Sequence, residues 1–220
     1  MNVLALDGAL GSFSVAFAGD AGERASASIP GNVALERGLH LVAMVLEGAA
    51  MRPERLDRIA VGIGPGTFTG LRIAIAYAKS LAQAWDLPLA GVSSFDALEL
   101  GINEDNVLTV VAPRPGIVSL RLRDGTRVSR ASGPIAQALD EVLAHRSAPS
   151  VVAGAPEDVI AALAERGIVA SARLPAIVPP AAAIAVIAAS IEAEQSVHAL
   201  HADYGELPVA KVPARPWSRS

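Results

Sequence analysis

A glycine-rich turn is the first stretch of this chain that could do chemistry. Residues 58–85, "RIAVGIGPGTFTGLRIAIAYAKSLAQAW", read as a strand, a turn containing Gly64 and Gly66, and a long apolar helix. Turns between a strand and a helix often hold phosphate groups, because the free amides at a helix N-terminus attract anions. The first question is therefore whether this turn binds a nucleotide.

Both common phosphate-binding patterns fail at this turn. A Walker A loop needs G-x-x-x-x-G-K-[ST], but Ala78 precedes Lys79 and Ile73 stands in place of the first glycine. The dinucleotide pattern G-x-G-x-x-G fails because Thr69 occupies the position of its third glycine. These mismatches favour a backbone role for the glycines, with Thr67 or Thr69 capping the helix.

Other residues that could act chemically lack suitable neighbours in the sequence. His198 and His201 lie near the C-terminus without the acidic residue of an H-E-x-x-H zinc site. Ser93 and Ser94 precede a predicted helix but do not belong to a G-x-S-x-G nucleophile turn. Asp7 follows the first strand, where a carboxylate could approach a phosphate, although a role in the hairpin turn is the simpler interpretation.

Composition narrows the class of protein. The chain has 220 residues, 52% of them hydrophobic, no cysteine and a net charge of −4. These values predict a folded protein without thiolate metal sites, and without the basic character typical of proteins that bind nucleic acids. The lack of cysteine and of an N-terminal signal pattern favours the cytoplasm. The uncharged run 174–191 contains three prolines, and the part after them is well short of the ~20 residues of a membrane span, so we expect no membrane contact.

The same order of elements occurs twice along the chain. In the first half, apolar periodicity predicts strands at 3–8, 12–19, 23–30, 58–64 and 87–94, helices at 33–50 and 69–85, and a short helix capped by Ser93 and Asp96. In the second half it predicts strands at 107–113, 116–125, 126–132 and 150–155, and helices at 134–146, 156–166 and after Pro180. The repeat predicts an α/β protein of two related lobes, 1–104 and 105–206, followed by a surface tail, 207–220.

The two long helices of the first half present distinct apolar surfaces. In the first, Asn32 is the predicted cap, and one face is formed by Leu35, Leu39, Val42, Leu46 and Ala49. In the second, small residues recur every four positions, at Gly70, Ala74, Ala78 and Ala82. Such a ridge lets another backbone approach closely, so we expect one side of the helix to face its own sheet and another side to face a partner. The alternative is a helix enclosed entirely within one subunit.

The stretch "GIGPGTFTGLRIAIAYAKSLA" resembles the motif of the TsaB (YeaZ) family, G-x-G-P-G-S/T-F-T-G-L/V-R-I-G. The likeness extends to "VLALDGALGSFSVAF" and "DLPLAGVSSFDAL", and is therefore dense over residues 3–98, while "PPAAAIAVIAAS" resembles the family's closing helix. The resemblance implies an actin-like, Hsp70-like ATPase (ASKHA) fold of two tandem lobes. It also implies a non-catalytic subunit that pairs with a TsaD-type transferase in threonylcarbamoylation of a tRNA adenosine next to the anticodon.

In the TsaB family, pairing uses the first two long helices. The resemblance therefore implies an interface formed by Leu39, Val42, Leu46, Gly64, Gly66, Thr67, Phe68, Gly70, Arg72, Ala74 and Ala78. It implies a TsaE-type ATPase as a further partner, and tRNA contact only through the complex. We expect the same helices to support a homodimer when the chain is alone, because a self-complementary surface can form a two-fold contact.

The chain departs from the pattern of catalytic relatives at several positions. Active members of this fold place an aspartate in each of two hairpins that hold ATP and magnesium, and Asp7 occupies the first of these positions. In the second hairpin, "VVAPRPGIVSL", Ala112, Ile117 and Ser119 replace acidic or aromatic residues of the related pattern D-A-R-x-G-E-V-Y. Ala34 stands where family members commonly have a histidine. We therefore expect no cofactor, with ATP at an interface shared with a partner left open.

Three other functions have unequal support in the sequence. The main alternative is a catalytically active ATPase or phosphotransferase of the same fold. A peptidase would need a metal pair or a nucleophile that the motifs do not provide. Direct tRNA binding could use the arginines of the second hairpin region, Arg114, Arg121, Arg123, Arg127 and Arg130, although such a face is usually only solvated. The segment 204–208, "YGELP", departs from the family's end pattern, proline-x-tyrosine-leucine-arginine, which casts doubt on contacts made through it.

Overall fold

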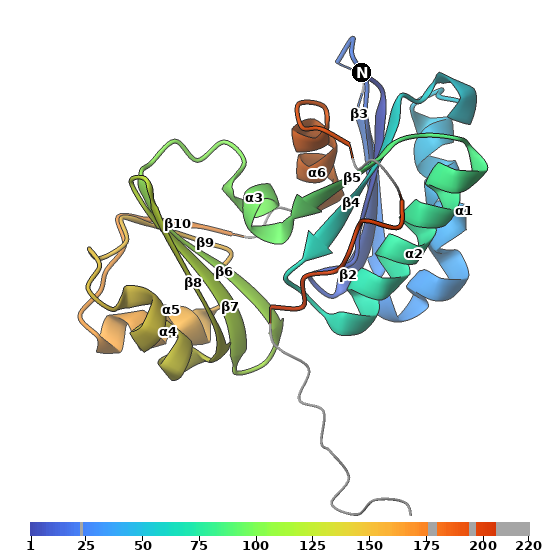
Figure 1. Cartoon of the computed structure of the whole chain (residues 1–220). Helices are drawn as coiled ribbons and strands as arrows, with labels where there is room; N and C mark the ends of the chain where they lie inside the picture. The colour runs from blue at the N-terminus through green and yellow to red at the C-terminus, as the bar shows by residue number, and fades with distance from the viewer. Residues whose placement is uncertain (23, 176–179, 194–196, 206–220) are drawn as a thin grey trace, which may run out of the picture.

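The computed structural model describes residues 1–22, 24–175, 180–193 and 197–205, and contains two β-sheets that form two lobes (Figure 1). The predicted tail, 207–220, lies outside the described residues. Among the residues that are described, no helix is long and apolar enough to cross a membrane.

The first lobe contains a five-stranded mixed sheet in the order β3-β2-β1-β4-β5. Its strands and helices are β1 (Val3–Asp7), β2 (Ser12–Ala18), β3 (Arg24–Pro30), α1 (Ala34–Gly48), β4 (Arg58–Gly64), α2 (Phe68–Ala84), β5 (Leu89–Ser93) and α3 (Ser94–Glu99). β1, β2 and β3 pair antiparallel, whereas β4 pairs parallel with both β1 and β5.

The second sheet repeats this arrangement. Its order, β10-β9-β6-β7-β8, is that of the first sheet read from the other edge. The elements are β6 (Asn106–Arg114), β7 (Ile117–Asp124), β8 (Arg127–Pro134), α4 (Ile135–Leu143), β9 (Val151–Ala153), α5 (Glu157–Glu165), β10 (Ala172–Leu174) and α6 (Pro180–Ala188). The predicted duplication is therefore confirmed. β10 was not predicted, because a strand of three residues has too few side chains to show a period.

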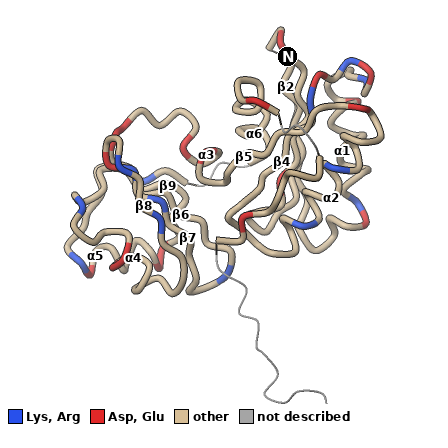
Figure 2. The backbone as a smooth tube through the Cα atoms, viewed as in Figure 1, with Lys and Arg blue, Asp and Glu red and all other residues tan. Residues whose placement is uncertain are grey.

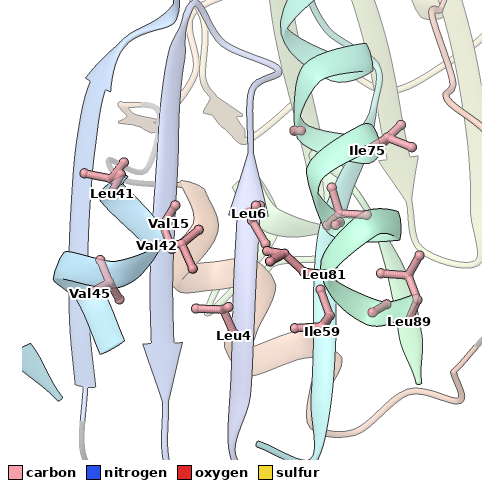
Figure 3. Close-up of a cluster of buried hydrophobic side chains, with 14 of the residues drawn as sticks. Leu4, Leu6, Val15, Leu41, Val42, Val45, Ile59, Ile75, Leu81 and Leu89 are labelled. Atoms are coloured by element: carbon pink, nitrogen blue, oxygen red, sulfur yellow. The ribbon is translucent and has the colours of Figure 1, made fainter. Parts of the chain in front are cut away.

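Strand alternation divides the first lobe into two apolar layers. Leu4 and Leu6 of β1 point to the layer covered by α1 and α2 (Figure 3). Val3 and Ala5 point to the opposite layer, where α6 packs. Successive side chains on a strand face opposite sides, so a strand buried on both faces is apolar throughout.

The chain crosses between the lobes at α3 and at α6. α3 follows β5 and lies at the junction, with contacts to β4, β5 and α6 of the first lobe and to β6 of the second, whereas α6 follows β10 but packs against β1, β2 and β4 of the first. Leu200 also joins the core of the first lobe. The predicted division into 1–104 and 105–206 follows the order of the chain, whereas α6 and Leu200 of the second segment pack with the first lobe.

α1 is rotated relative to the predicted face. Ala34 begins the helix after a short 3-10 turn, and Asn32 makes no cap. Val42 and Leu46 are buried, whereas Leu35 and Leu39 of the same predicted face are 71% and 54% exposed. Apolar residues extend around much of this helix, so the period alone does not determine which part of the apolar arc faces the sheet.

The small-residue ridge of α2 faces its own sheet. Ala74 and Ala78 are fully buried and Ala82 is 1% exposed, all within the core of the first lobe. The prediction that Ala74 and Ala78 contact a partner is therefore wrong, because a smooth ridge lets a helix lie close to a sheet as well as to another helix. Ser93 caps α3 as predicted, since its hydroxyl accepts a hydrogen bond from the Phe95 amide at 3.2 Å.

Candidate functional site

The glycines of the β4–α2 turn allow other parts of the chain to approach the backbone. A Cβ atom added at Gly70 would lie 1.9 Å from the carbonyl oxygen of Gly8, and one at Gly66 would lie 2.6 Å from the Cβ of Ala9. A Cβ at Gly64 would lie 2.0 Å from the carbonyl oxygen of Asp203. The turn is therefore packed against the β1–β2 hairpin and against the segment around Asp203, and these contacts explain its glycines without a phosphate.

The beginning of α2 is also engaged by the hairpin. The Thr67 amide donates to the Ala9 carbonyl at 2.8 Å, and the Thr67 hydroxyl donates to the Gly8 carbonyl at 3.1 Å. The side chain of Thr67 makes no capping hydrogen bond, although it is the residue that precedes the helix, and Thr69 lies inside the helix. The predicted caps are therefore wrong, and Thr67 instead joins the helix to the hairpin.

Asp7 is enclosed in the first lobe. The residue is 1% exposed, and its Oδ2 accepts a hydrogen bond from the Ala9 amide at 3.1 Å, the contact expected of a hairpin-turn aspartate. Burial raises the pKa of Asp7 to about 6, although the backbone amides of Ala9 and Gly8 act in the opposite direction. A Cβ atom at Gly62 would lie 2.0 Å from Oδ1 of Asp7, so Gly62 makes room for this carboxyl group.

A cleft of about 560 Å³ lies beside the two hairpins that bind nucleotide in active members of this fold. It is lined by Leu10, Gly11, Thr67, Ala112, Pro113, Arg114, Pro115, Gly116, Ile117, Val118, Ile135, Pro156, Glu157 and Asp158. Asp7 is absent from this lining, and Ala112 cannot supply the second carboxylate. Magnesium is held by oxygen ligands, and the carboxylates of this lining are Glu157 and Asp158 of α5 rather than the two hairpin aspartates of the usual magnesium–ATP site. In the part of the chain that the structure describes, no three His, Cys, Asp or Glu side chains gather as a metal site.

Two arginines considered for tRNA binding instead pair with carboxylates of α3, and Figure 2 shows basic residues gathered along the second sheet. Nη1 of Arg121 lies 2.6 Å from Oδ1 of Asp96, and its Nη2 lies 3.0 Å from Oε1 of Glu99. Nε of Arg123 lies 3.3 Å from Oε2 of Glu99. The Arg121 guanidinium also stacks 5.1 Å from the ring centre of Phe95. The prediction of a purely solvated arginine face is therefore wrong at Arg121, which is only 9% exposed.

Residues 203–205 connect the glycine turn to the second lobe. The Asp203 amide donates to the Ile63 carbonyl at 2.6 Å, and the ring of Tyr204 lies 4.9 Å from the ring of Phe68. A Cβ atom at Gly205 would lie 2.2 Å from Oγ of Ser119. No sequence pattern predicted this contact, since it joins residues far apart in the chain.

The predicted interface residues divide into three groups. Leu39, Phe68 and Arg72 are exposed, and Thr67 and Gly70 are half-buried. The remaining members are buried: Val42, Leu46, Gly64, Gly66, Ala74 and Ala78. The structure adds two exposed apolar side chains of α1 that were not predicted as interface residues, Leu35 and Met44.

An apolar groove of about 320 Å³ lies between α1 and α2. Its lining brings together three predicted interface residues, Leu39, Val42 and Leu46, with Leu81 and Trp85 of α2. The other lining residues are Ala43, Glu47, Met51, Arg52 and Pro53. Val42 and Leu46 therefore reach this surface even though little of each side chain is exposed. We refer to this groove, with the exposed Leu35 and Leu39 beside it, as the α1–α2 surface.

The second lobe provides an internal comparison for this surface. α4 and α5 correspond to α1 and α2 in the repeat, and the exposed residues of α4 are Ala136, Gln137, Asp140 and Glu141. Those of α5 are Glu157, Asp158, Ala161, Ala164 and Glu165. Neither helix, both of which are fully described, has an exposed large hydrophobic residue. The exposed leucines of α1 are therefore not required by the fold.

Comparison with known proteins gives a consistent result. Residues 35–198 match the family model described as tRNA N6-adenosine threonylcarbamoyltransferase, TsaD. The tRNA threonylcarbamoyladenosine biosynthesis protein TsaB of Escherichia coli is 33% identical over 54% of this chain and 53% of its own length. The protein of that name from Bacillus subtilis is 40% identical over 28% of this chain and 27% of its own length. Among curated relatives from Mycobacterium, the chain spans between 31% and 53% of their length.

Solved structures extend the likeness to the whole fold. YeaZ from Pseudomonas aeruginosa is 26% identical to this chain and superposes with a TM-score of 0.71. The aligned region covers 92% of this chain and 99% of that one. The ethanolamine utilization protein EutJ from Carboxydothermus hydrogenoformans, at 15% identity, has a TM-score of 0.55 over 84% of this chain and 89% of its own and shares the fold alone.

Proposed function

Since the chain belongs to the tRNA N6-adenosine threonylcarbamoyltransferase (TsaD) family, and to the TsaB (YeaZ) family within it, we propose that it is a non-catalytic subunit that pairs with a TsaD-type transferase. Its two lobes have the actin-like, Hsp70-like ATPase fold. The proposed partner adds threonylcarbamoyl to a tRNA adenosine next to the anticodon, in the cytoplasm. This chain contributes a surface that holds the partner, and it reaches tRNA only through the complex.

The α1–α2 surface is the observation that carries this proposal. Leu35 and Leu39 are 71% and 54% exposed, beside a groove with an almost entirely apolar lining. The equivalent helices of the second lobe, α4 and α5, expose only polar residues and alanine, so helices at this position of the fold do not need exposed leucines. Covering a leucine fully contributes about 1.5–3 kcal/mol, which makes such side chains effective anchors for a partner.

The predicted interface needs one revision. Ala74 and Ala78 lie against the sheet and cannot reach a partner without unfolding α2. We propose that the contact is centred on the groove with Leu35 and Leu39 of α1, and that the other exposed residues Met44, Phe68 and Arg72 lie outside the groove lining. Arg72 lies 4.9 Å from the ring centre of Phe68, so the two side chains form one exposed unit at the start of α2.

Light scattering after gel filtration tests the proposal. The chain is run alone and then mixed with the TsaD-type protein of the same genome, and we expect a mass equal to one copy of each. Leu35→Arg and Leu39→Arg place charge on the α1–α2 surface at exposed positions, so they leave the fold intact and abolish the complex. Val169→Arg is the matched control, because Val169 is 80% exposed in the other half of the chain. A complex that survives both leucine variants, or that Val169→Arg abolishes equally, contradicts this interface.

Further parts of the proposal concern the other partners. The same surface supports a homodimer in the absence of the transferase, so the homodimer should disappear as the transferase is added. A TsaE-type ATPase would join the pair, and this is tested by adding it to the purified complex in the same experiment. ATP at the shared interface is tested by titrating nucleotide into the pair and into each subunit separately.

The alternative is an ATPase or phosphotransferase that uses the cleft beside the hairpins. The volume of this cleft, about 560 Å³, is the observation in its favour, and the enclosure of Asp7 is the observation against it. Calorimetric titration of the isolated chain with ATP, with and without magnesium, separates the two functions. Magnesium-dependent binding that Asp7→Asn removes would favour the enzyme.

A further inference from the structure

A small cavity lies where the β1–β2 hairpin meets α3 and the beginning of α6. Its lining consists of Asp7, Ala9, Leu10, Ser94, Ala97, Leu98 and Pro180. The space open to the centre of a water molecule is about 10 Å³. A single buried water needs roughly 10–15 Å³ by this measure, so the cavity has the size of one water.

Two polar side chains line this otherwise apolar cavity. Ser94 is 4% exposed, and its hydroxyl is one of the buried groups in the described part of the chain that have no hydrogen-bond partner. Asp7 is 1% exposed, and a carboxylate can accept about four hydrogen bonds, more than its neighbouring amides supply. A buried polar group without a partner is unfavourable, and most such groups in proteins are satisfied by ordered water.

We infer that the cavity binds one water molecule, held between the hydroxyl of Ser94 and the carboxyl group of Asp7. The water donates one hydrogen to the Asp7 carboxylate and accepts the hydroxyl hydrogen of Ser94. Both groups are then satisfied without displacing the apolar lining, and the water has the two polar partners that a stable site requires.

A metal ion does not fit the same space. Magnesium takes about six oxygen ligands in a near-octahedral shell, and it usually keeps several waters. The cavity has room for about one water and contains one carboxyl group. The chemistry of the site therefore favours a neutral ligand that both donates and accepts hydrogen bonds.

The water would connect the two lobes through α3. Ser94 begins α3, and the same helix carries Asp96 and Glu99, which pair with Arg121 of the second sheet. The Asp7–water–Ser94 contact thus links the first hairpin to α3, the helix that forms ion pairs with the second lobe.

A crystal structure at a resolution that shows individual waters gives the direct test. We expect one water within about 2.5–3.0 Å of both Oγ of Ser94 and an Asp7 carboxyl oxygen. An empty cavity, or a direct hydrogen bond between the two side chains, overturns the inference.

A double-mutant cycle measured by urea unfolding gives a second test. With a shared water, Ser94→Ala lowers the folding equilibrium constant of the native chain about tenfold, because the buried water loses one of its two hydrogen-bond partners. In the Asp7→Asn background, Ser94→Ala lowers the folding equilibrium constant less than about threefold. The neutral amide of asparagine accepts a weaker hydrogen bond from the water than the carboxylate does, so less is lost with the hydroxyl. Ser80→Ala on exposed α2 surface is the control, with an effect below about twofold. Effects of Ser94→Ala that are equal in both backgrounds contradict a shared ligand.

Discussion

Replacing Asp7 by asparagine should stabilise the protein at neutral pH and progressively less at acidic pH. Asp7 is buried without a basic partner in the contacts that the structure describes, and burial raises its pKa from 3.8 to about 6. The folded state therefore binds the Asp7 proton more tightly than the unfolded state does. The contribution of Asp7 to stability is fully present below the unfolded pKa and is lost as the pH rises through about 6.

The size of this effect follows from the difference between the two pKa values. A difference of about 2 units corresponds to about 3 kcal/mol above pH 7, and to about 1 kcal/mol near pH 4.5, where the folded state keeps the proton and the unfolded state has largely lost it. Asparagine has no proton to lose, and it keeps the shape of the protonated carboxyl group. The free energy of unfolding of Asp7→Asn, relative to the native chain, should therefore rise with pH by about 2 kcal/mol over this range.

Urea unfolding at several pH values measures this difference directly. Only the part that changes with pH reports the Asp7 proton, because a lost or altered hydrogen bond gives a constant offset. Asp20→Asn is the matched control, since Asp20 is an exposed aspartate of the same lobe. A pH-independent difference for Asp7→Asn, or one that falls as the pH rises, would refute the reasoning from burial.

Three further predictions concern packing and the junction between the lobes, and all are measured by urea unfolding. Ala78→Arg should destabilise the protein by at least about 3 kcal/mol, because it places a charge in the core of the first lobe. Ala76→Arg lies two residues earlier, on the exposed side of α2, and should change stability by less than about 0.5 kcal/mol. Equal effects of Ala76→Arg and Ala78→Arg would contradict the orientation assigned to this helix. Gly70→Ala should cost several kcal/mol, since its Cβ would lie 1.9 Å from a hairpin carbonyl, whereas Gly48→Ala on the open surface of α1 should stabilise by about 0.5–1 kcal/mol. Glu99→Gln should cost about 1–3 kcal/mol, because it removes the carboxylate that two arginines share, and an unchanged midpoint would show that this pairing does not hold the lobes.

Local patterns in the sequence were sufficient for the order of the elements, apart from the short strand β10. The strands of the first hairpin, the strand 58–64 and the helix that begins near Phe68 each appear within a few residues of their predicted positions. Alternation in strands and the 3.6-residue period in helices depend on neighbouring residues, so they can be read from one segment at a time. Their recurrence after residue 105 was enough to predict the duplicated lobes.

Contacts between distant segments could not be predicted in this way. The exposure of Leu35 and the burial of Ala78 depend on which side of each helix meets the sheet. The burial of Arg121 depends on α3, which arrives from the other lobe, and the packing at Gly64 depends on Asp203, almost at the other end of the described chain. In an isolated helix or strand, nothing determines whether such a residue will be buried or exposed, because the other segment of the contact is missing.

The sequence by itself therefore determined the repeat of elements, the fold class and the family, because these follow from local periodicity and from a long glycine-containing motif. The tertiary structure alone decided which apolar residues remain outside and which polar residues lie inside. The glycine motif illustrates the difference: its residues were evident in the sequence, but the groups that need the missing Cβ atoms, the Gly8 and Asp203 carbonyls, become its neighbours only when the chain folds. A close approach depends on both segments that meet, so it cannot be predicted from the sequence of either segment alone.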